Sequence, residues 1–287
     1  MQRTTPSTGI PDELRTWIVQ QARAGVSPEA LLAPLLRAGW AEADAVAAVE
    51  REIRGFLEAH AREHDLPLPL RVPAPPGIDD AGEIVADGHA VQVLAQMLLP
   101  RVIVFGNLLS EEECARLIDL ARGRLQRSRV VGAGPGGEAV FEGRTSEGMS
   151  FARGANLLCE RIERRVAALL DWPSENGEGL QVLRYSPGAR YEPHYDWFDP
   201  SAPGSAAALA RGGQRVASLV MYLNTPQRGG ATVFTEARFE VAARRGNAVF
   251  FSYERPHAMT RTLHAGAPVV AGEKWIATLW MRERRFE

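Results

Sequence analysis

Residues 183–196 read LRYSPGARYEPHYD, and this stretch decides how the rest of the chain is interpreted. Near its end, His194 and Asp196 are separated by a single residue. In an extended segment alternate side chains project to the same face, so these two side chains point together off one side of a strand. A histidine and a carboxylate placed in this way can ligate one metal ion.

The third ligand that such an ion needs is expected far downstream, in residues 262–269, which read TLHAGAPV and contain His264. Two histidines and one carboxylate, with other positions left open, are the ligand set of non-haem Fe(II) oxygenases. In a chain with six histidines, a lone His-x-Asp arises by chance too often to be diagnostic. His257 is the alternative ligand, but it lacks the Ala-Gly-x-Pro-Val sequel and the lysine at the right distance, so His264 is preferred.

Lys274 lies ten residues after His264. It begins the segment 274–280, which reads KWIATLW and is predicted to form a buried strand. A lysine in such a strand must meet an anion or lose its charge, because an unpaired charge is costly to bury. A dicarboxylate cosubstrate would provide that anion.

Six motifs occur in order along the second part of the chain. They are RYxxGxxYxxHxD (184–196), YLN (222–224), GGxTxF (229–234), GxAxFF (246–251), HAGxPV (264–269) and GxKW (272–275). Through these motifs the region from about Arg101 to Glu287 resembles the catalytic domain of prolyl 4-hydroxylases, which are Fe(II)- and 2-oxoglutarate-dependent dioxygenases. The order of the motifs makes the resemblance specific, although no single motif would suffice.

The resemblance implies a role for each candidate site residue. Fe(II) would be held by His194, Asp196 and His264, and 2-oxoglutarate by Lys274, Tyr185 and Thr278. The residues implied in substrate binding are Arg144, Ser146, Tyr191 and Trp280. Tyr185 and Tyr191 are equally well explained as aromatic residues of strands, and Trp280 as a core residue.

The implied reaction is hydroxylation of a prolyl residue in a peptide or protein, with decarboxylation of 2-oxoglutarate to succinate and with ascorbate as the reductant. Three positions depart from the family pattern: Ala231 and Met259 replace acidic residues, and Ala267 replaces a cysteine. These changes are expected to affect recognition of a proline-containing peptide more than the binding of iron and 2-oxoglutarate. Hydroxylation of a free amino acid or another side chain stays open, as does a non-catalytic binding or sensor module that uses the N-terminal helices.

The chain is expected to divide into an N-terminal helical bundle at 1–65, a proline-rich linker at 66–77 and a dioxygenase domain at 78–287. Three amphipathic helices are predicted, from Pro11 to Gly25, from Ser27 to Ala38 and over about 41–61. Trp17 and Trp40 would belong to the core of this bundle or to an interface with an unknown protein. The five prolines of the linker forbid a helix and favour an extended spacer.

In the second domain, a helix is predicted near 89–98, a strand over 101–105, and two helices after Ser110 and over about 155–170. The sequence from Ser110 to Glu113 is a capping box. Short strands are predicted at 216–224, 231–234, 239–242, 248–253 and 274–281. The pattern predicts an α+β fold, with a double-stranded β-helix (jelly-roll) core, flanking helices and the small three-helix bundle.

Two glycine-containing segments are candidate lids over the site. Residues 132–137 read GAGPGG, but no strand–turn–helix unit surrounds them, so a phosphate-binding loop is rejected. By the resemblance, 131–143 is a mobile segment that closes over the peptide. Residues 198–213 are rich in Ala, Ser, Gly and Pro, and such low side-chain bulk fits a lid or a plain loop equally well.

Net charge bears on the expected binding partners, and the expected compartment bears on the state of the two cysteines. A formal net charge of -2 does not favour nucleic acid or an anionic membrane as a partner. The sequence shows no secretory signal and no apolar run that would span a bilayer, so a cytoplasmic location is expected. Cys114 and Cys159 are then expected to be buried thiols rather than a disulfide.

Overall fold

The computed structural model describes residues 10–78, 82–128, 130–131, 138–139 and 143–287. It divides into two compact units, Met1–Pro69 and Leu70–Glu287. The division falls within the proline-rich segment at 66–77. Among the described residues, no helix is both long and apolar enough to cross a membrane.

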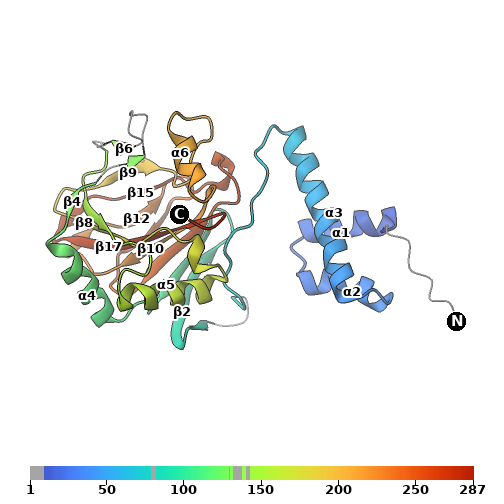
Figure 1. Ribbon diagram of the computed structural model, residues 1–287, viewed down its shortest axis with the longest axis horizontal. Coiled ribbons are helices and arrows are strands. Elements are labelled where there is room, and N and C mark those ends of the chain that lie inside the picture. The colour runs from blue at the N-terminus through green and yellow to red at the C-terminus, as the bar shows by residue number, and fades with distance from the viewer. Residues whose placement is uncertain (1–9, 79–81, 129, 132–137, 140–142) are drawn as a thin grey trace. The chain divides into compact units, whose positions relative to one another are not determined.

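The first unit contains α1 (Asp12–Arg23), α2 (Pro28–Arg37) and α3 (Glu42–Glu63) (Figure 1). Their apolar faces meet in a small core that includes Ile18 and Leu35. Trp17 and Trp40 pack against this core, so the structure favours a packing role for both indoles. Ser27 caps α2 by accepting a hydrogen bond from the backbone N–H of Ala30.

The second unit is built around a large antiparallel sheet, which has nine strands in the described part of the chain. In spatial order they are β1 (Glu83–Ala86), β2 (His89–Met97), β3 (Arg101–Gly106), β14 (Ala248–Ser252), β10 (Arg215–Tyr222), β17 (Lys274–Arg282), β8 (Gln181–Tyr185), β7 (Glu147–Ser150) and β4 (Gln126–Arg127). The central strands β14, β10 and β17 are buried along almost their whole length.

A smaller antiparallel sheet contributes the other wall of the site. Its order is β13 (Phe239–Val241), β12 (Thr232–Phe234), β15 (His264–Gly266) and β9 (Tyr191–His194). Val220 and Ile276 of the large sheet and Phe234 and Val241 of the small sheet share one core. Two facing sheets around such a core are consistent with a jelly roll. Two short pairs complete the described strands: β11 (Arg228–Gly229) with β16 (Val269–Ala271), and β5 (Val130–Val131) with β6 (Glu138–Ala139).

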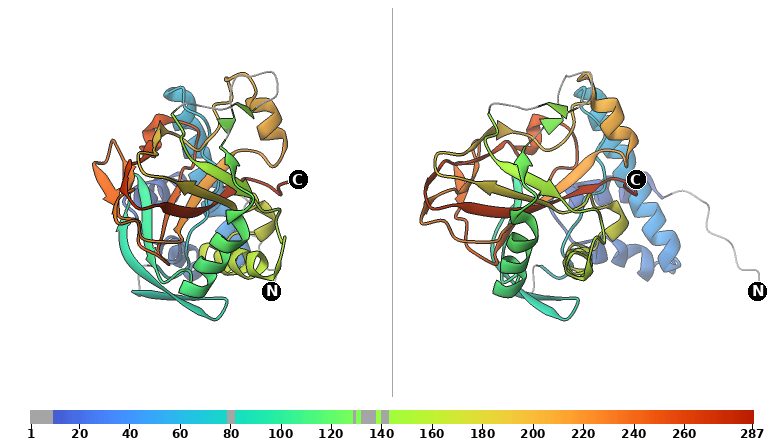
Figure 2. Two further views of the ribbon diagram at one scale, coloured as in Figure 1. Left: turned by 90° about the vertical axis from the view of Figure 1, so that its left-hand side faces the viewer. Right: turned by 60° about the vertical axis from the view of Figure 1, so that its left-hand side comes forward.

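The opposite face of the large sheet is covered by α4 (Glu111–Arg122) and α5 (Leu157–Leu170) (Figures 1 and 2). Leu117 of α4 and Ile162 of α5 pack there with Leu219 of β10 and Ala277 of β17. Strand alternation therefore sends odd-numbered residues of β17 toward the helices and even-numbered residues, beginning with Lys274, toward the inner face. Cys114 and Cys159 are buried and free, and burial raises the pKa of each thiol to about 11.

The structure corrects two predictions made from the sequence. Residues 89–98 are not helical, because they form β2, which pairs with β1 on one side and with β3 on the other. Asp87 and Gly88 link β1 to β2 with φ values of 50° and 75°, and Asp-Gly is a strong signal for a tight hairpin. The predicted loop at 198–213 contains a short helix, α6 (Ser205–Ala210). Residues 132–137 and 140–142 of the other predicted loop lie outside the described residues.

A buried ion pair joins the two helices under the large sheet. Arg165 of α5 donates from Nη1 and Nη2 to the two carboxylate oxygens of Glu113 on α4, at 2.8 and 2.9 Å. The capping box is confirmed, since Glu113 also accepts from the backbone N–H of Ser110. Burial by itself raises the pKa of Glu113, but the hydrogen bonds from Arg165 and Ser110 bring it below its ordinary value.

Glu113→Ala should lower the free energy of unfolding of this unit by about 3–5 kcal/mol, because the Arg165 guanidinium would stay buried without its partner. Urea unfolding followed by circular dichroism measures the change. Glu112→Ala, in the same helical turn but exposed, is the matched control and should change stability by less than about 0.5 kcal/mol. Equal effects of the two substitutions would show that the ion pair contributes nothing specific.

Candidate metal centre

Pairing of β9 with β15 brings the predicted ligands together. The two strands are antiparallel, with His264 directly opposite His194 and their ring centroids 4.3 Å apart. Asp196 lies just beyond the end of β9. Its two carboxylate oxygens are 3.6 Å from Nε2 of His194 and 3.7 Å from Nε2 of His264. One potential ligand atom from each residue lies within 4.8 Å of the other two, close enough to share an ion.

Both imidazoles are oriented by backbone carbonyls. Nδ1 of His194 is 2.8 Å from the carbonyl oxygen of Glu192, and Nδ1 of His264 is 3.0 Å from that of Thr262. Because a carbonyl oxygen only accepts, each Nδ1 carries the hydrogen and donates it. The lone pair on each Nε2 is then directed to the cluster, as metal-ligating histidines require.

The protonation states also suit a metal. Burial, and next the neighbouring His194, lower the pKa of His264 to about 4, so its imidazole is neutral at pH 7. Burial alone raises the pKa of Asp196, but contact with His264 and His194 brings it well below its ordinary value. A neutral imidazole and an ionised carboxylate are the forms in which His264 and Asp196 bind divalent ions.

Asp196 is held by a hydrogen-bonded chain that the sequence did not indicate. The hydroxyl of Ser218 on β10 donates to Oδ2 of Asp196 at 2.6 Å and is 2.9 Å from the hydroxyl of Tyr253. Ser218 is fully buried in β10, within the apolar run that follows Arg215. A lone serine in such a run was the available signal, because a buried hydroxyl must find a polar partner.

A narrow cavity runs from the three ligands between the sheets. It is also lined by Lys274, Tyr185 and Thr278, the residues predicted to hold 2-oxoglutarate. Lys274 stands opposite Tyr185 in the β17–β8 pair, and Thr278 lies on the same inner face of β17. The Lys274 Nζ is 5.5 Å from the centre of the Tyr185 ring and 5.7 Å from that of Tyr222.

Lys274 is a buried cation, with only 3% of its surface exposed. Among residues 10–78, 82–128, 130–131, 138–139 and 143–287, no carboxylate lies within ion-pair distance of its ammonium group. Burial lowers the pKa of Lys274 from 10.5 to about 8. An anion that entered this cavity would therefore meet a positive charge that lacks a protein partner.

A second, open cavity of about 820 Å³ meets the narrow one at the metal cluster. Residues shared by the two cavities are Arg144, Tyr191, His194, Asp196 and Trp280. The open cavity is further lined by aromatic side chains that include Tyr195, Trp197 and Phe198. Its size is in the range of ligand-binding clefts, so a substrate held there would lie beside the metal ligands.

Three of the four predicted substrate residues line this junction. Tyr191 stacks on His194 with ring centroids 3.6 Å apart, and the guanidinium of Arg144 lies 4.9 Å from the Tyr191 ring centre. Trp280 is half-buried and faces both cavities rather than the core. Its ring lies 4.0 Å from the guanidinium of Arg215, a residue that the sequence analysis missed.

Ser146, the fourth predicted substrate residue, lies apart from the other three, and its role in substrate binding stays a prediction. Its side chain is fully buried and its hydroxyl donates to that of Ser128 at 2.9 Å, and it lines neither cavity. The physical reason is pairing: Arg144 bridges to Tyr191, whereas the backbone carbonyl of Ser146 accepts from the N–H of Ser128. The side chain of Arg144 therefore lines the cavities, whereas that of Ser146 is buried against Ser128.

A buried network of charges supports the wall of the open cavity. Glu178 accepts from Nε and Nη2 of Arg215 at 2.7 and 2.9 Å, and from Nη1 of Arg282 at 3.1 Å. This two-pronged contact fixes the plane of the Arg215 guanidinium against Trp280 and Phe198. Arg215 stands at the start of a strand, where sequence pattern alone does not distinguish it from a solvent-exposed charge.

Comparisons with known proteins agree with this geometry. The family model described as "2OG-Fe(II) oxygenase superfamily" matches residues 180–282, which contain the three ligands and Lys274. Two Arabidopsis thaliana proteins are each 38% identical over 66% of this chain: "Probable prolyl 4-hydroxylase 7", over 64% of its length, and "Prolyl 4-hydroxylase 5", over 70%. The chain therefore belongs to the prolyl 4-hydroxylase family of 2-oxoglutarate- and Fe(II)-dependent oxygenases.

Among solved structures, the viral collagen prolyl hydroxylase from Paramecium Bursaria Chlorella virus-1, in its 2OG complex, is 30% identical to this chain. The match covers 63% of this chain and 95% of that one, with a TM-score of 0.49. The chain described here spans about two thirds of the length of the Arabidopsis relatives.

Ser218→Ala should weaken Fe(II) binding about 10- to 100-fold, because the hydroxyl that orients the Asp196 carboxylate is lost. Anaerobic titration with Fe(II) measures the dissociation constant. Ser252→Ala, equally buried on the neighbouring strand β14, is the matched control and should leave the constant unchanged. The same Fe(II) affinity in both variants would mean that the hydrogen bond does not position the ligand.

Proposed function

We propose that this protein hydroxylates a prolyl residue in a peptide or protein, using Fe(II) and 2-oxoglutarate and releasing succinate. The observation that carries the proposal is the position of Lys274. A buried ammonium group without a carboxylate partner among the described residues lines the same cavity as the two histidines and the aspartate. A site for metal alone would not need that cation, whereas a site for a dicarboxylate beside a metal would.

His194, Asp196 and His264 would hold the iron through two imidazole nitrogens and one carboxylate oxygen. These donors suit Fe(II), and three protein ligands leave positions open for other molecules. Bound there with 2-oxoglutarate, the iron supplies the activation of dioxygen that hydroxylation requires. The protein keeps both Nε2 atoms free of hydrogen and, through Ser218, keeps the Asp196 carboxylate in place.

Lys274 would pair with the carboxylate of 2-oxoglutarate that lies away from the metal. An ion pair in a dry cavity is stable only when hydrogen bonds satisfy the remaining lone pairs. Tyr185 and Thr278, which line the cavity beside Lys274, carry the hydroxyl groups proposed to do this. The aliphatic side chains of Leu183, Val220 and Ile276 exclude water around the pair.

The open cavity is proposed to hold the substrate peptide. Arg144, Tyr191 and Trp280 are its residues nearest to the metal ligands, and the aromatic faces suit the apolar ring of proline. The indole N–H groups of Trp197 and Trp280 are buried without a hydrogen-bond partner among the described residues, so a peptide carbonyl would be a favourable acceptor.

The three departures from the family pattern lie outside these cavities. Ala231, Met259 and Ala267 are absent from the described lining of both. Met259 lies in a short 3₁₀ helix and is 40% exposed. Their replacement therefore leaves the proposed contacts with iron, 2-oxoglutarate and proline in place.

The test is a reaction of proline-containing peptides with Fe(II), 2-oxoglutarate and ascorbate, which we propose as the reductant. Mass spectrometry should find one added oxygen on proline, with one succinate formed for each oxygen added. His194→Ala and Asp196→Ala should abolish both products while circular dichroism shows the fold retained. His257→Ala, which removes a histidine outside both cavities, is the control and should stay active.

Wild-type turnover in the His194 or Asp196 variant would rule out the proposed iron site. Oxidation of a free amino acid, with no peptide modified, would keep the chemistry but overturn the proposed substrate. Binding of neither Fe(II) nor 2-oxoglutarate under anaerobic conditions would instead indicate a non-catalytic module.

The affinity for 2-oxoglutarate should fall as the pH rises above about 8. Burial sets the pKa of Lys274 near that value, so the ammonium group is charged below it and neutral above it. Only the charged form attracts the cosubstrate dianion, so the apparent dissociation constant should rise by up to about tenfold per pH unit. Anaerobic titrations followed by tryptophan fluorescence measure it.

Two substitutions separate the charge of Lys274 from other effects of pH. Lys274→Arg keeps a cation that does not titrate in this range, so its dissociation constant should vary much less with pH. Lys274→Ala should bind 2-oxoglutarate weakly at every pH tested. The same pH dependence in wild type and in both variants would exclude Lys274 as its source.

A further inference from the structure

A second group of metal-ligating side chains lies in the helical unit, at the end of α3. Residues 60–64 read HAREH, so that His60, Glu63 and His64 lie within one helical turn of each other. Residues three and four positions apart are neighbours on one face of a helix. The proposed hydroxylase reaction does not use this cluster.

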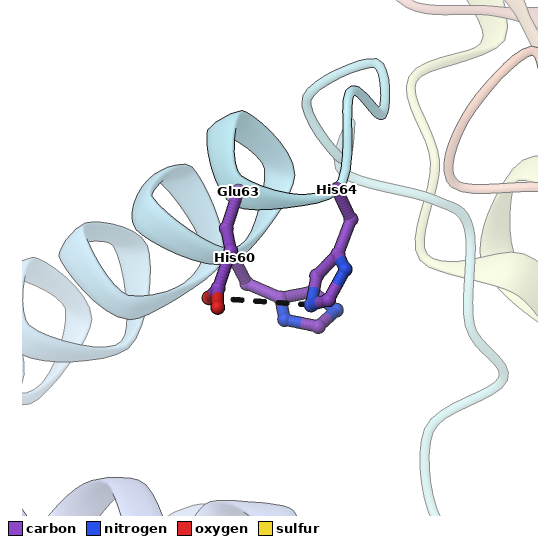
Figure 3. Close-up of side chains that lie close together, drawn as sticks. All are labelled: His60, Glu63 and His64. Atoms are coloured by element: carbon purple, nitrogen blue, oxygen red, sulfur yellow. Dashed lines mark ion pairs between the residues drawn. The ribbon is translucent and has the colours of Figure 1, made fainter.

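The three side chains converge, as Figure 3 shows. One potential ligand atom from each lies within 4.8 Å of the other two. The rings of His60 and His64 have centroids 4.3 Å apart, and Nε2 of His64 is 4.0 Å from a carboxylate oxygen of Glu63. Phe56, one turn earlier, is stacked on His60 with centroids 6.0 Å apart, which restricts the His60 ring.

The ring nitrogens of this cluster are available. Within the described part of the chain, neither His60 nor His64 makes a hydrogen bond through its ring, unlike His194 and His264. Glu63 and His64 are exposed, with 75% and 51% of their side-chain surfaces accessible. An ion can therefore reach the cluster from solvent without any opening of the fold.

We propose that His60, Glu63 and His64 form a second metal site, which takes Zn²⁺ or a similar borderline divalent ion. Two imidazoles and one carboxylate match the donor preference of zinc, whereas Ca²⁺ and Mg²⁺ prefer sites made of oxygen. Three protein ligands leave a fourth position for water. In known metalloproteases with the spacing His-x-x-Glu-His, the two histidines of the helix hold zinc and the glutamate acts as general base, so the motif supports His60 and His64 as the ligand pair. Glu63 is included because its carboxylate lies close to both rings.

The position in the helix adds an electrostatic reason. α3 ends at Glu63 with His64 as its C-cap, so the cluster occupies the last turn. Unpaired carbonyl groups make that end of a helix partially negative, and a bound cation is stabilised there. An ion that joins His60 to His64 would also tie together the final turn, which otherwise frays most easily.

Zinc binding to the full chain tests the proposal. His264→Ala removes a ligand from the iron centre, and in that background Zn²⁺ is titrated against a chromophoric chelator. One equivalent should bind, and His60→Ala or His64→Ala added to the same background should weaken it at least tenfold. Glu63→Ala in the same background should also weaken zinc binding, whereas Glu50→Ala, which removes an exposed carboxylate from α3 outside the cluster, is its matched control and should leave zinc binding unchanged.

A second measurement identifies the ligands directly. On addition of Zn²⁺, the imidazole resonances of His60 and His64 should shift together in ¹H–¹³C NMR spectra, while those of His89 should not. Absence of zinc binding in the His264→Ala background would overturn the proposal, as would undiminished binding in the His60 and His64 variants. Succinate production by His60→Ala should equal that of the wild type, so this site and the proposed hydroxylase site can fail independently.

Discussion

The pairing of β9 with β15 is the contact on which the rest of the site depends. It sets His264 opposite His194, so that two short strands of the smaller sheet supply both imidazoles. Asp196 joins the two imidazoles because it lies only two residues after His194. Because the backbone hydrogen bonds fix the register, a slip of one residue would turn His264 to the other face and dismantle the cluster. The surrounding sheets hold that register in place.

The second constraint is the burial of charge. Asp196 and Lys274 are both almost wholly inside the protein, and each would be costly to bury alone. Asp196 is stabilised by Ser218 and by the two imidazoles, whereas Lys274 has aromatic rings around it but no described carboxylate. Because no described carboxylate balances the charge of Lys274, the cavity that this side chain lines is suited to bind an anion. The Glu178–Arg215–Arg282 network differs, because its charges already satisfy one another and support the wall beside Trp280.

Much of the fold could be predicted because its signals are local. The capping box at Ser110 and the apolar run of β17 are readable within a few residues, and the structure has both the capping box and a buried strand there. Predictions failed where long-range pairing decided the outcome. Residues 89–98 look helical in isolation but become a strand between β1 and β3. Ser218 and Arg215 were missed because their importance comes from partners far along the chain.

By itself, the sequence determined the ligand types, the one-residue spacing of His194 and Asp196, and the lysine in a buried strand. These follow from strand periodicity and from the cost of burying charge, which act over a few residues. Only the tertiary structure decided that His264 faces His194, that Ser218 holds Asp196, and that the two cavities meet at the metal ligands. Those features depend on register between distant strands, which is set by the packing of the two sheets and not by any local pattern.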